Sequence, residues 1–168
     1  MNVSTSKPIR EIRLVEAPPS FDRTLVIDLM RLADDSESEI LGYLPTGRLF
    51  LLYFGDSDQL PIGQLLLWEH GEGVVEIKSL SISPAIQRIG MGTYFVERVI
   101  ALLKRNGARQ IHVSTSTADH DVIRFYQRNG FRLLRVERDV FTVEKGYPKS
   151  LICDGIPVRD RIWMDLQL

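Results

Sequence analysis

The chain has 168 residues, of which 44% are hydrophobic and 26% are charged, and its formal net charge is −1 at pH 7. This length suits one domain with its own core, so we expect a single domain over residues 1–168, and the composition excludes a disordered or fibrous protein. Because the net charge is close to zero, there is no general positive field, and we expect no nucleic-acid partner.

The cysteine usage and the N-terminus favour the cytoplasm. Cys153 is the only cysteine, which excludes an intramolecular disulfide and a thiolate metal cluster. Residues 1–7 lack the apolar region of a signal peptide, and no later run reaches the ~18 apolar residues of a membrane span, so we expect no membrane partner. His70, His112 and His120 share no metal-ligand spacing, and we predict no metal.

The first half of the chain predicts two helices among strands. Alternation predicts a strand over 9–16, and the Pro18-Pro19 break is followed by a helical pattern whose N-cap we expect at Ser20. A short helix through 40–43 comes next. Short turn-rich connectors then indicate antiparallel hairpins between three apolar runs, at 49–54, 62–68 and 74–82.

The second half alternates strands and helices. Apolar residues at helical spacing, among them Val96 and Val99, predict a long helix that ends at Asn106-Gly107. A strand through Ile111 follows, and Asp119 is expected to cap a second helix. Further strands are expected at 131–143 and 158–168, on either side of a loop at 144–157. We expect the strands that flank the long helix to be parallel.

The apolar positions change parity within the strand 74–82. Val75 and Ile77 are followed by Leu80 and Ile82, and a regular strand cannot place all four on one face. One extra residue near Lys78, a β-bulge, would return them to one face and splay the strand from its neighbour. The unpaired backbone groups could then bind an extended ligand as an added strand does. The alternative is a regular strand that is buried on both faces.

Two glycines, Gly90 and Gly92, bracket the expected start of the long helix. The free N–H groups and the positive dipole end of a first helical turn form an anion site, and pyrophosphate is its natural guest. Glycine allows close backbone approach, and Arg88 adds a positive charge. The alternative is an ordinary turn, since neither the Rossmann nor the Walker glycine pattern is present.

Two segments resemble the signatures of one family, the GNAT superfamily of acyl-CoA N-acyltransferases. SISPAIQRIGMG at 81–92 resembles its phosphate loop, Q/R-x-x-G-x-G/A, after a bulged strand. DHDVIRFYQRNGF at 119–131 is similar to its second signature, N-x-x-A-x-x-x-Y-x-x-x-G-F. The two occur in the family's order over residues 74–131. The resemblance implies an α+β fold in which a mixed, mainly antiparallel sheet of about seven strands has a central splay and is flanked by helices.

The resemblance also implies acetyl-CoA as co-substrate and assigns residues to it. The backbone of three residues would meet pantetheine: Leu80, Ser81 and Ile82. The pyrophosphate would lie among the loop residues Gln87, Arg88, Ile89, Gly90, Met91, Gly92 and Thr93. Asp119 stands where the family has asparagine, so it either contacts the cofactor or only caps the helix.

Acyl transfer to an amine needs a base for the amine and an acid for the leaving thiolate. An ammonium has a pKa of about 10, and general base catalysis is typically worth about 10²–10⁴ in rate. Glu76 lies at the spacing from Gln87 that the base has in some members of the superfamily; the alternative is a surface carboxylate near Lys78. Tyr126 matches the family's tyrosine that protonates the thiolate, and the alternative is a core aromatic.

The sequence therefore predicts an N-acetyltransferase that moves an acetyl group from acetyl-CoA directly to a primary amine of a small molecule or peptide. Two alternatives stay open, a catalytically silent acyl-CoA-binding sensor and a structural partner-binding domain. We expect the acceptor side to come from the first helices and the loop 144–157, where the acidic stretch 34–39 either attracts a cation or is simply solvated. Exchange of the last strands between two chains would give a homodimer.

Overall fold

The computed structural model describes residues 12–55 and 60–168, and a mixed sheet of seven strands forms its centre. The strands are β1 Ile12–Glu16, β2 Arg48–Phe54, β3 Gly63–Gly71, β4 Val74–Ile82, β5 Gln110–Ser116, β6 Arg132–Glu137 and β9 Arg161–Gln167. Their spatial order is β1-β2-β3-β4-β5-β9-β6, and β4 with β5 is the parallel pair in an otherwise antiparallel sheet. The predicted fold class and the parallel pair around the long helix are confirmed.

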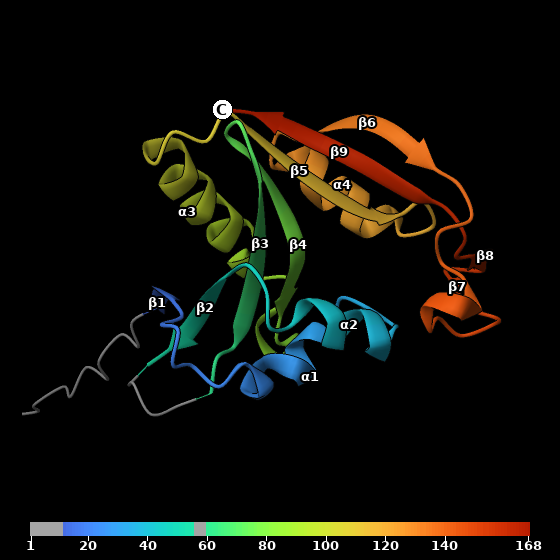
Figure 1. Ribbon diagram of the computed structural model, residues 1–168, viewed down its shortest axis with the longest axis horizontal. Coiled ribbons are helices and arrows are strands. Elements are labelled where there is room, and N and C mark those ends of the chain that lie inside the picture. The colour runs from blue at the N-terminus through green and yellow to red at the C-terminus, as the bar shows by residue number, and fades with distance from the viewer. Residues whose placement is uncertain (1–11, 56–59) are drawn as a thin grey trace, which may run out of the picture.

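Helices cover both faces of this sheet (Figure 1). They are α1 Ile27–Met30, α2 Glu37–Tyr43, α3 Met91–Arg105 and α4 His120–Arg128, with 3-10 turns at Arg23–Val26, Pro84–Ile86 and Val143–Lys145. Phe95 of α3 and Tyr126 of α4 belong to one core cluster, whereas Met30 of α1 and Ile40 of α2 belong to another. The sheet is therefore the middle of three layers.

Strand β2 shows why its sequence is apolar almost throughout. Phe50 and Leu52 pack in the cluster with α3 and α4, and Leu49 and Leu51 pack in the cluster with α1 and α2. All four side chains are at most 1% exposed. A strand buried on both faces has no polar side to show, so its sequence is a continuous apolar run.

The predicted bulge lies at Lys78. In the β3–β4 pair, Leu66 is opposite Ser79 and Leu67 is opposite Ile77, so Lys78 has no opposite residue. Because of this extra residue, the odd-numbered Val75 and Ile77 and the even-numbered Leu80 and Ile82 all pack in the same core cluster. A bulge, and not a regular strand buried on both faces, thus explains the parity change.

The central splay begins directly at this bulge. Strands β4 and β5 pair only from Val74 to Ile77 and from Gln110 to Val113. Beyond these residues β4 stays paired with β3, while β5 stays paired with β9. The two strands therefore part at the centre of the sheet, as predicted.

The expected N-cap at Ser20 is wrong. The cap is Asp22, whose carboxylate accepts hydrogen bonds from the Thr24 backbone N at 3.0 Å and from Thr24 Oγ1 at 2.7 Å. This arrangement starts a 3-10 turn, and α1 that follows it is only four residues long. The apolar periodicity had predicted a longer helix because a 3-10 turn and an α-helix place apolar residues on similar faces.

The expected strand 131–143 is too long, since β6 ends at Glu137. The backbone N of Asp139 donates to Asp160 Oδ1 at 2.9 Å, and Asp139 has a left-handed φ of 54°, which turns the chain out of the sheet. The expected loop 144–157 also contains a small hairpin, β7 Ile152–Cys153 with β8 Ile156–Pro157. Asp154 and Gly155 form its turn at φ of 49° and 79°, the hairpin signal of an Asp-Gly pair.

The other predicted boundaries agree closely with the structure. Helix α3 ends at Asn106-Gly107, and Gly107 has the left-handed φ of 83° that a glycine stop requires. Strand β9, the last strand, lies between β5 and β6 of its own chain. Residues 9–11 of the first predicted strand and most of the connector 55–58 lie outside the described residues. Across 12–55 and 60–168, no helix is long and apolar enough to cross a membrane.

Candidate active site

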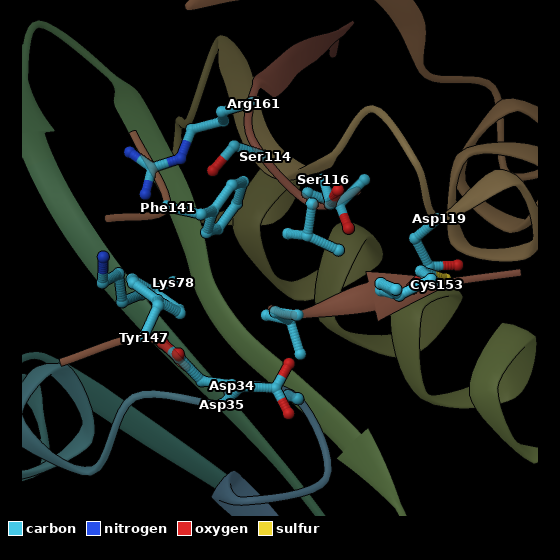
Figure 2. Close-up of a pocket in the computed structure, with 15 residues that line it drawn as sticks. Asp34, Asp35, Lys78, Ser114, Ser116, Asp119, Phe141, Tyr147, Cys153 and Arg161 are labelled. Carbon is cyan, nitrogen blue, oxygen red and sulfur yellow. The ribbon is translucent and has the colours of Figure 1, made fainter. Parts of the chain in front are cut away.

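A cavity of about 300 Å³ lies where β4 and β5 part (Figure 2). Lys78 forms its wall on β4, and Ser114, Thr115 and Ser116 form its wall on β5. The remaining walls come from the segment after α1, the N-cap of α4, the region around the small hairpin and the start of β9. These residues are Ala33, Asp34, Asp35, Asp119, Phe141, Tyr147, Leu151, Ile152, Cys153, Val158 and Arg161. The loop 144–157 thus contributes walls, and the first helices contribute only through the connection between α1 and α2.

Asp34 and Tyr147 are the cavity's perturbed titratable pair. Burial raises the pKa of the Asp34 carboxyl, although the Ser36 backbone N donates a hydrogen bond to Oδ1 at 3.0 Å. Burial and the negative charge of Asp34 both raise the pKa of the Tyr147 phenol. Tyr147 therefore remains a protonated hydroxyl at neutral pH, beside a carboxyl that holds its proton more tightly than a free one.

Glu76 is buried, so it is not a surface carboxylate. It is 5% exposed, and its Oε2 lies 2.7 Å from Nε2 of the half-exposed His70. Glu76 lies outside the splay cavity. It lines a neighbouring hollow of about 350 Å³ together with His112, Arg135 and Trp163. Within the described part of the chain, the buried Nε2 of His112 has no hydrogen-bond partner.

The two cavities lie on the same face of the sheet. Val75 and Ile77 point into the cluster with α3 and α4, so Glu76 between them points to the opposite face. Lys78 reaches that same face, since its Nζ lies 4.6 Å from the ring centre of Trp68 and 5.4 Å from that of Tyr43. Glu76 is therefore next to the splay cavity without lining it.

The loop from Gln87 to Gly90 has a constrained backbone. Arg88 and Gly90 have left-handed φ values of 65° and 86°, and α3 begins immediately afterwards with no side-chain cap. Gln87 Nε2 donates to the Ile82 carbonyl at 2.8 Å, which ties the loop to the end of β4. Left-handed φ is uncommon for a residue with a Cβ, so the chain turns at Arg88 in an unusual conformation.

The other residues assigned to the loop differ in exposure. Ile89 is 67% exposed, whereas Met91, Gly92 and Thr93 are half-buried. A Cβ on Gly92 would lie 3.1 Å from Cε2 of Phe125 on α4. Gly92 therefore has a packing reason of its own, the close approach of α3 to α4.

The three residues assigned to pantetheine lie on β4 beyond the splay. Leu80 is half-buried in the cluster with α3, and Ser81 and Ile82 are buried. On the other face of β4, Gln64 Nε2 donates hydrogen bonds to Ser79 Oγ at 2.7 Å and to Ser81 Oγ at 3.2 Å. These bonds hold β4 against β3 beyond the bulge. The side of this segment away from β3 pairs with no strand among the described residues.

Tyr126 lies in the core on the face opposite to Glu76. It is 5% exposed, and its ring contacts Phe125 and Phe131 edge-on at centroid distances of 5.1 and 5.3 Å. Burial raises the pKa of its phenol well above the usual value, so the hydroxyl keeps its proton at neutral pH. These contacts fit the role of a core aromatic as well as that of an acid. Tyr126 and Glu76 lie on opposite faces of the sheet.

Asp119 is the N-cap of α4, as predicted. Its Oδ1 accepts a hydrogen bond from the Val122 backbone N at 3.0 Å, and the residue also lines the splay cavity. Cys153 lines the same cavity with a half-buried thiol whose pKa is raised, mainly by burial. Across 12–55 and 60–168, no group of three or more His, Cys, Asp or Glu side chains is placed to hold a metal ion.

Several cavity residues were not singled out from the sequence as site residues. Ser114 and Ser116 could have been, because they alternate with the core residues Ile111 and Val113 and so share the face of Glu76. Arg161 carried no such signal. It reaches the cavity because β9 pairs with β5 and places Arg161 opposite Ser116, a contact between residues distant in sequence.

The comparisons with known proteins agree with this arrangement. The family profile described as acetyltransferase (GNAT) family matches residues 9–131. The chain is 29% identical over 141 residues to the uncharacterized N-acetyltransferase YvbK of Bacillus subtilis, covering 83% of this chain and 88% of the relative. The splay, the glycine loop and α4 all lie within the segment that the family profile matches. Residues 9–11 of that segment lie outside the described residues.

Similar solved structures extend the agreement to the whole fold. An IAA acetyltransferase from Bacillus cereus is 26% identical, with a TM-score of 0.80 over 94% of this chain and 100% of that one. A GNAT family acetyltransferase from Elizabethkingia anophelis with acetyl-CoA bound is 25% identical, with a TM-score of 0.81 over 96% of this chain and all of the other. The chain therefore belongs to the GNAT family of acetyltransferases.

Proposed function

We propose that this chain moves the acetyl group of acetyl-CoA directly to the primary amine of a small molecule or peptide. The observation that carries the proposal is the splay at Lys78, with a cavity on one face and an uncapped helix start, α3, at the end of the same strand. The acetyl-CoA and CoA complexes of relatives at 25% and 26% identity support the same co-substrate here.

The residues at the splay fit a CoA molecule. Two left-handed residues on either side of Ile89, Arg88 and Gly90, lead into free N–H groups at the start of α3, which suits a pyrophosphate. The unpaired side of Leu80 to Ile82 offers backbone groups to the amides of a pantetheine arm. Bound acetyl-CoA supplies the acetyl group as a thioester.

We assign the base to Glu76, which takes a proton from the incoming ammonium through water, because it borders the cavity without lining it. His70 connects Glu76 to solvent and gives the proton a route out of the site. The amine nitrogen then forms a bond to the acetyl carbon while the carbon–sulfur bond breaks. Tyr126, whose raised pKa keeps it protonated, donates its proton to the departing sulfur.

A thiol-release assay with acetyl-CoA tests the proposal across amine classes: polyamines, amino acids, aminoglycosides and peptide N-termini. Release that depends on both the amine and the enzyme, with an N-acetyl product by mass spectrometry, is the expected result. An increase in Tm with millimolar acetyl-CoA but no release for any amine would instead favour a silent acyl-CoA sensor. No increase in Tm would contradict acetyl-CoA binding itself.

A further inference from the structure

The splay cavity holds a cation that the protein leaves without a hydrogen bond. The Arg161 side chain is 19% exposed, and its guanidinium makes no hydrogen bond to any residue of 12–55 or 60–168. Its nearest carboxylate oxygen is Glu137 Oε2, at 3.8 Å, and that oxygen already accepts a hydrogen bond from Trp163 Nε1 at 2.9 Å. The guanidinium is half-buried and pairs with Glu137 only at this long distance, so its N–H groups are available to donate hydrogen bonds to a ligand.

Aromatic rings hold this guanidinium in place. Its carbon lies 5.5 Å from the ring centre of Phe141 and 5.8 Å from that of Trp163. Stacking of this kind restrains an arginine side chain while leaving its N–H edges free, and those edges match the two oxygens of a carboxylate. The site is thus prepared before a ligand arrives.

A second cation lies on the same side of the cavity. Figure 2 shows the charged ends of Lys78 and Arg161 on one side and Asp119 on the other. Among the described residues, no carboxylate lies within 4 Å of Lys78 Nζ, which lies over the rings of Trp68 and Tyr43. The charge of Lys78 also attracts the Asp34 carboxylate, at longer range. Lys78 is the extra residue of the bulge and lines the cavity, so its charge and that of Arg161 face the same space.

Carboxylates line the rest of the cavity, namely Asp34, Asp35 and Asp119. A cavity with two cations on one side and carboxylates elsewhere complements a ligand that carries both charges. A phosphate dianion would place two negative charges among these carboxylates, whereas a ligand carboxylate would place only one. The carboxylate is repelled less and therefore fits the cavity better. The cavity volume of about 300 Å³ suits a small molecule.

We infer that the acceptor is an amino acid or a similar amine that carries a carboxylate, with Arg161 and Lys78 as the groups that bind the carboxylate. This inference rests on the proposed function and names the substrate class of the same site. The ammonium of such an acceptor would lie toward the acidic side of the cavity.

The experiment compares matched acceptors that differ only in the carboxylate. Lysine is paired with cadaverine, phenylalanine with 2-phenylethylamine, and phenylalaninamide serves as the neutral analogue of phenylalanine. Acetyl-CoA thiol release gives kcat/KM for each. We expect at least one amino acid to exceed its decarboxylated partner by about tenfold or more, since hydrogen bonds to charged groups are the strong ones.

The variant Arg161→Gln should lower kcat/KM about 10- to 100-fold for the preferred amino acid and leave the decarboxylated amine within about threefold. Arg135→Gln is the matched control, because that guanidinium also stacks on Trp163, at 5.0 Å, but lies outside the splay cavity. It should leave the preference for the amino acid unchanged. Lys78→Gln gives a second test if the first variant fails to fold.

The outcomes separate the two ideas. Acetylation of the plain amines at least as fast as of the amino acids would overturn the inference and leave the proposed function standing. A preference for amino acids that survives both Arg161→Gln and Lys78→Gln would overturn the assignment of these cations. Absence of acetyl transfer to every acceptor, with acetyl-CoA bound, would remove the proposed function and the inference with it.

Discussion

Oε2 of Glu76 lies 2.7 Å from Nε2 of His70, and these two residues differ sharply in exposure. Glu76 is buried at the edge of the splay, whereas His70 is 46% exposed on the neighbouring strand. A buried base next to an exposed imidazole can take a proton from a substrate and return it to solvent. The pair therefore joins a buried carboxylate of β4, next to the splay, to an exposed imidazole of β3.

Replacement of Glu76 tests the base directly. Glu76→Gln should lower kcat about 10²- to 10⁴-fold and leave the Kd for acetyl-CoA unchanged, because the amide cannot take the proton. Steady-state kinetics and calorimetric titration measure the two quantities. Glu97→Gln, at an exposed position of α3, is the control. If Asp34→Asn caused the larger loss, the carboxyl that lines the cavity would be the base instead.

Tyr126→Phe tests the acid. The substitution keeps the edge-on contacts with Phe125 and Phe131, so we expect little change in Tm. It should lower kcat about 10²-fold where acetyl transfer limits the rate. Pre-steady-state thiol release identifies that step. A wild-type rate of the transfer step in the variant would leave Tyr126 with a packing role only.

Arg88→Gln tests the phosphate loop. Loss of one charged partner should raise the Kd for acetyl-CoA about tenfold, and the effect should weaken with added salt because Arg88 is exposed. Arg98→Gln, a second exposed arginine further along α3 whose guanidinium stacks on Tyr94, is the matched control. Equal Kd values for both variants and the wild type would argue that Arg88 does not contact the cofactor.

Asp119→Ala tests the cap. Loss of the hydrogen bond to the Val122 backbone N should lower the free energy of unfolding by about 1 kcal/mol, the usual cost of losing an N-cap. Chemical denaturation measures the change. Asp121→Ala removes an exposed carboxylate of the same turn and should cost less. A rise in the Kd for acetyl-CoA with unchanged stability would show that Asp119 serves the cofactor and not the helix.

Asp34 predicts a pH dependence of stability. Because its pKa is raised, the native state binds the proton more tightly than the unfolded state, so the carboxyl favours folding at low pH. That contribution is lost as the pH rises from the ordinary carboxyl pKa through the higher native one. The free energy of unfolding of Asp34→Asn, which does not titrate, should therefore rise relative to that of the wild type as the pH increases from about 4, the ordinary carboxyl pKa, towards neutral.

Denaturation at several pH values checks this, with Asp35→Asn as the control for loss of one negative charge from the same cavity. A difference between Asp34→Asn and wild type that stays constant with pH would contradict the assigned pKa direction. A difference of the opposite sign would mean that the hydrogen bond from Ser36 outweighs burial.

The sequence by itself determined the order of the main strands and the ends of the long helices, and it favoured the bulge that the structure then showed. These features follow from local chemistry: apolar parity around Lys78, a glycine stop at Gly107 and a capping carboxylate at Asp119. The glycine loop was located the same way, because its residues are contiguous and their pattern is specific.

Only the tertiary structure decided the shape of the acceptor site. Glu76 proved to be buried against His70, which no local pattern indicates, since the contact joins adjacent strands through side chains. Arg161 and Lys78 come from β9 and β4 and line one cavity because β9 pairs with β5, and β5 parts from β4 directly before Lys78. Contacts between residues distant in sequence depend on packing and leave no periodic pattern, so the cofactor side could be predicted and the acceptor side could not.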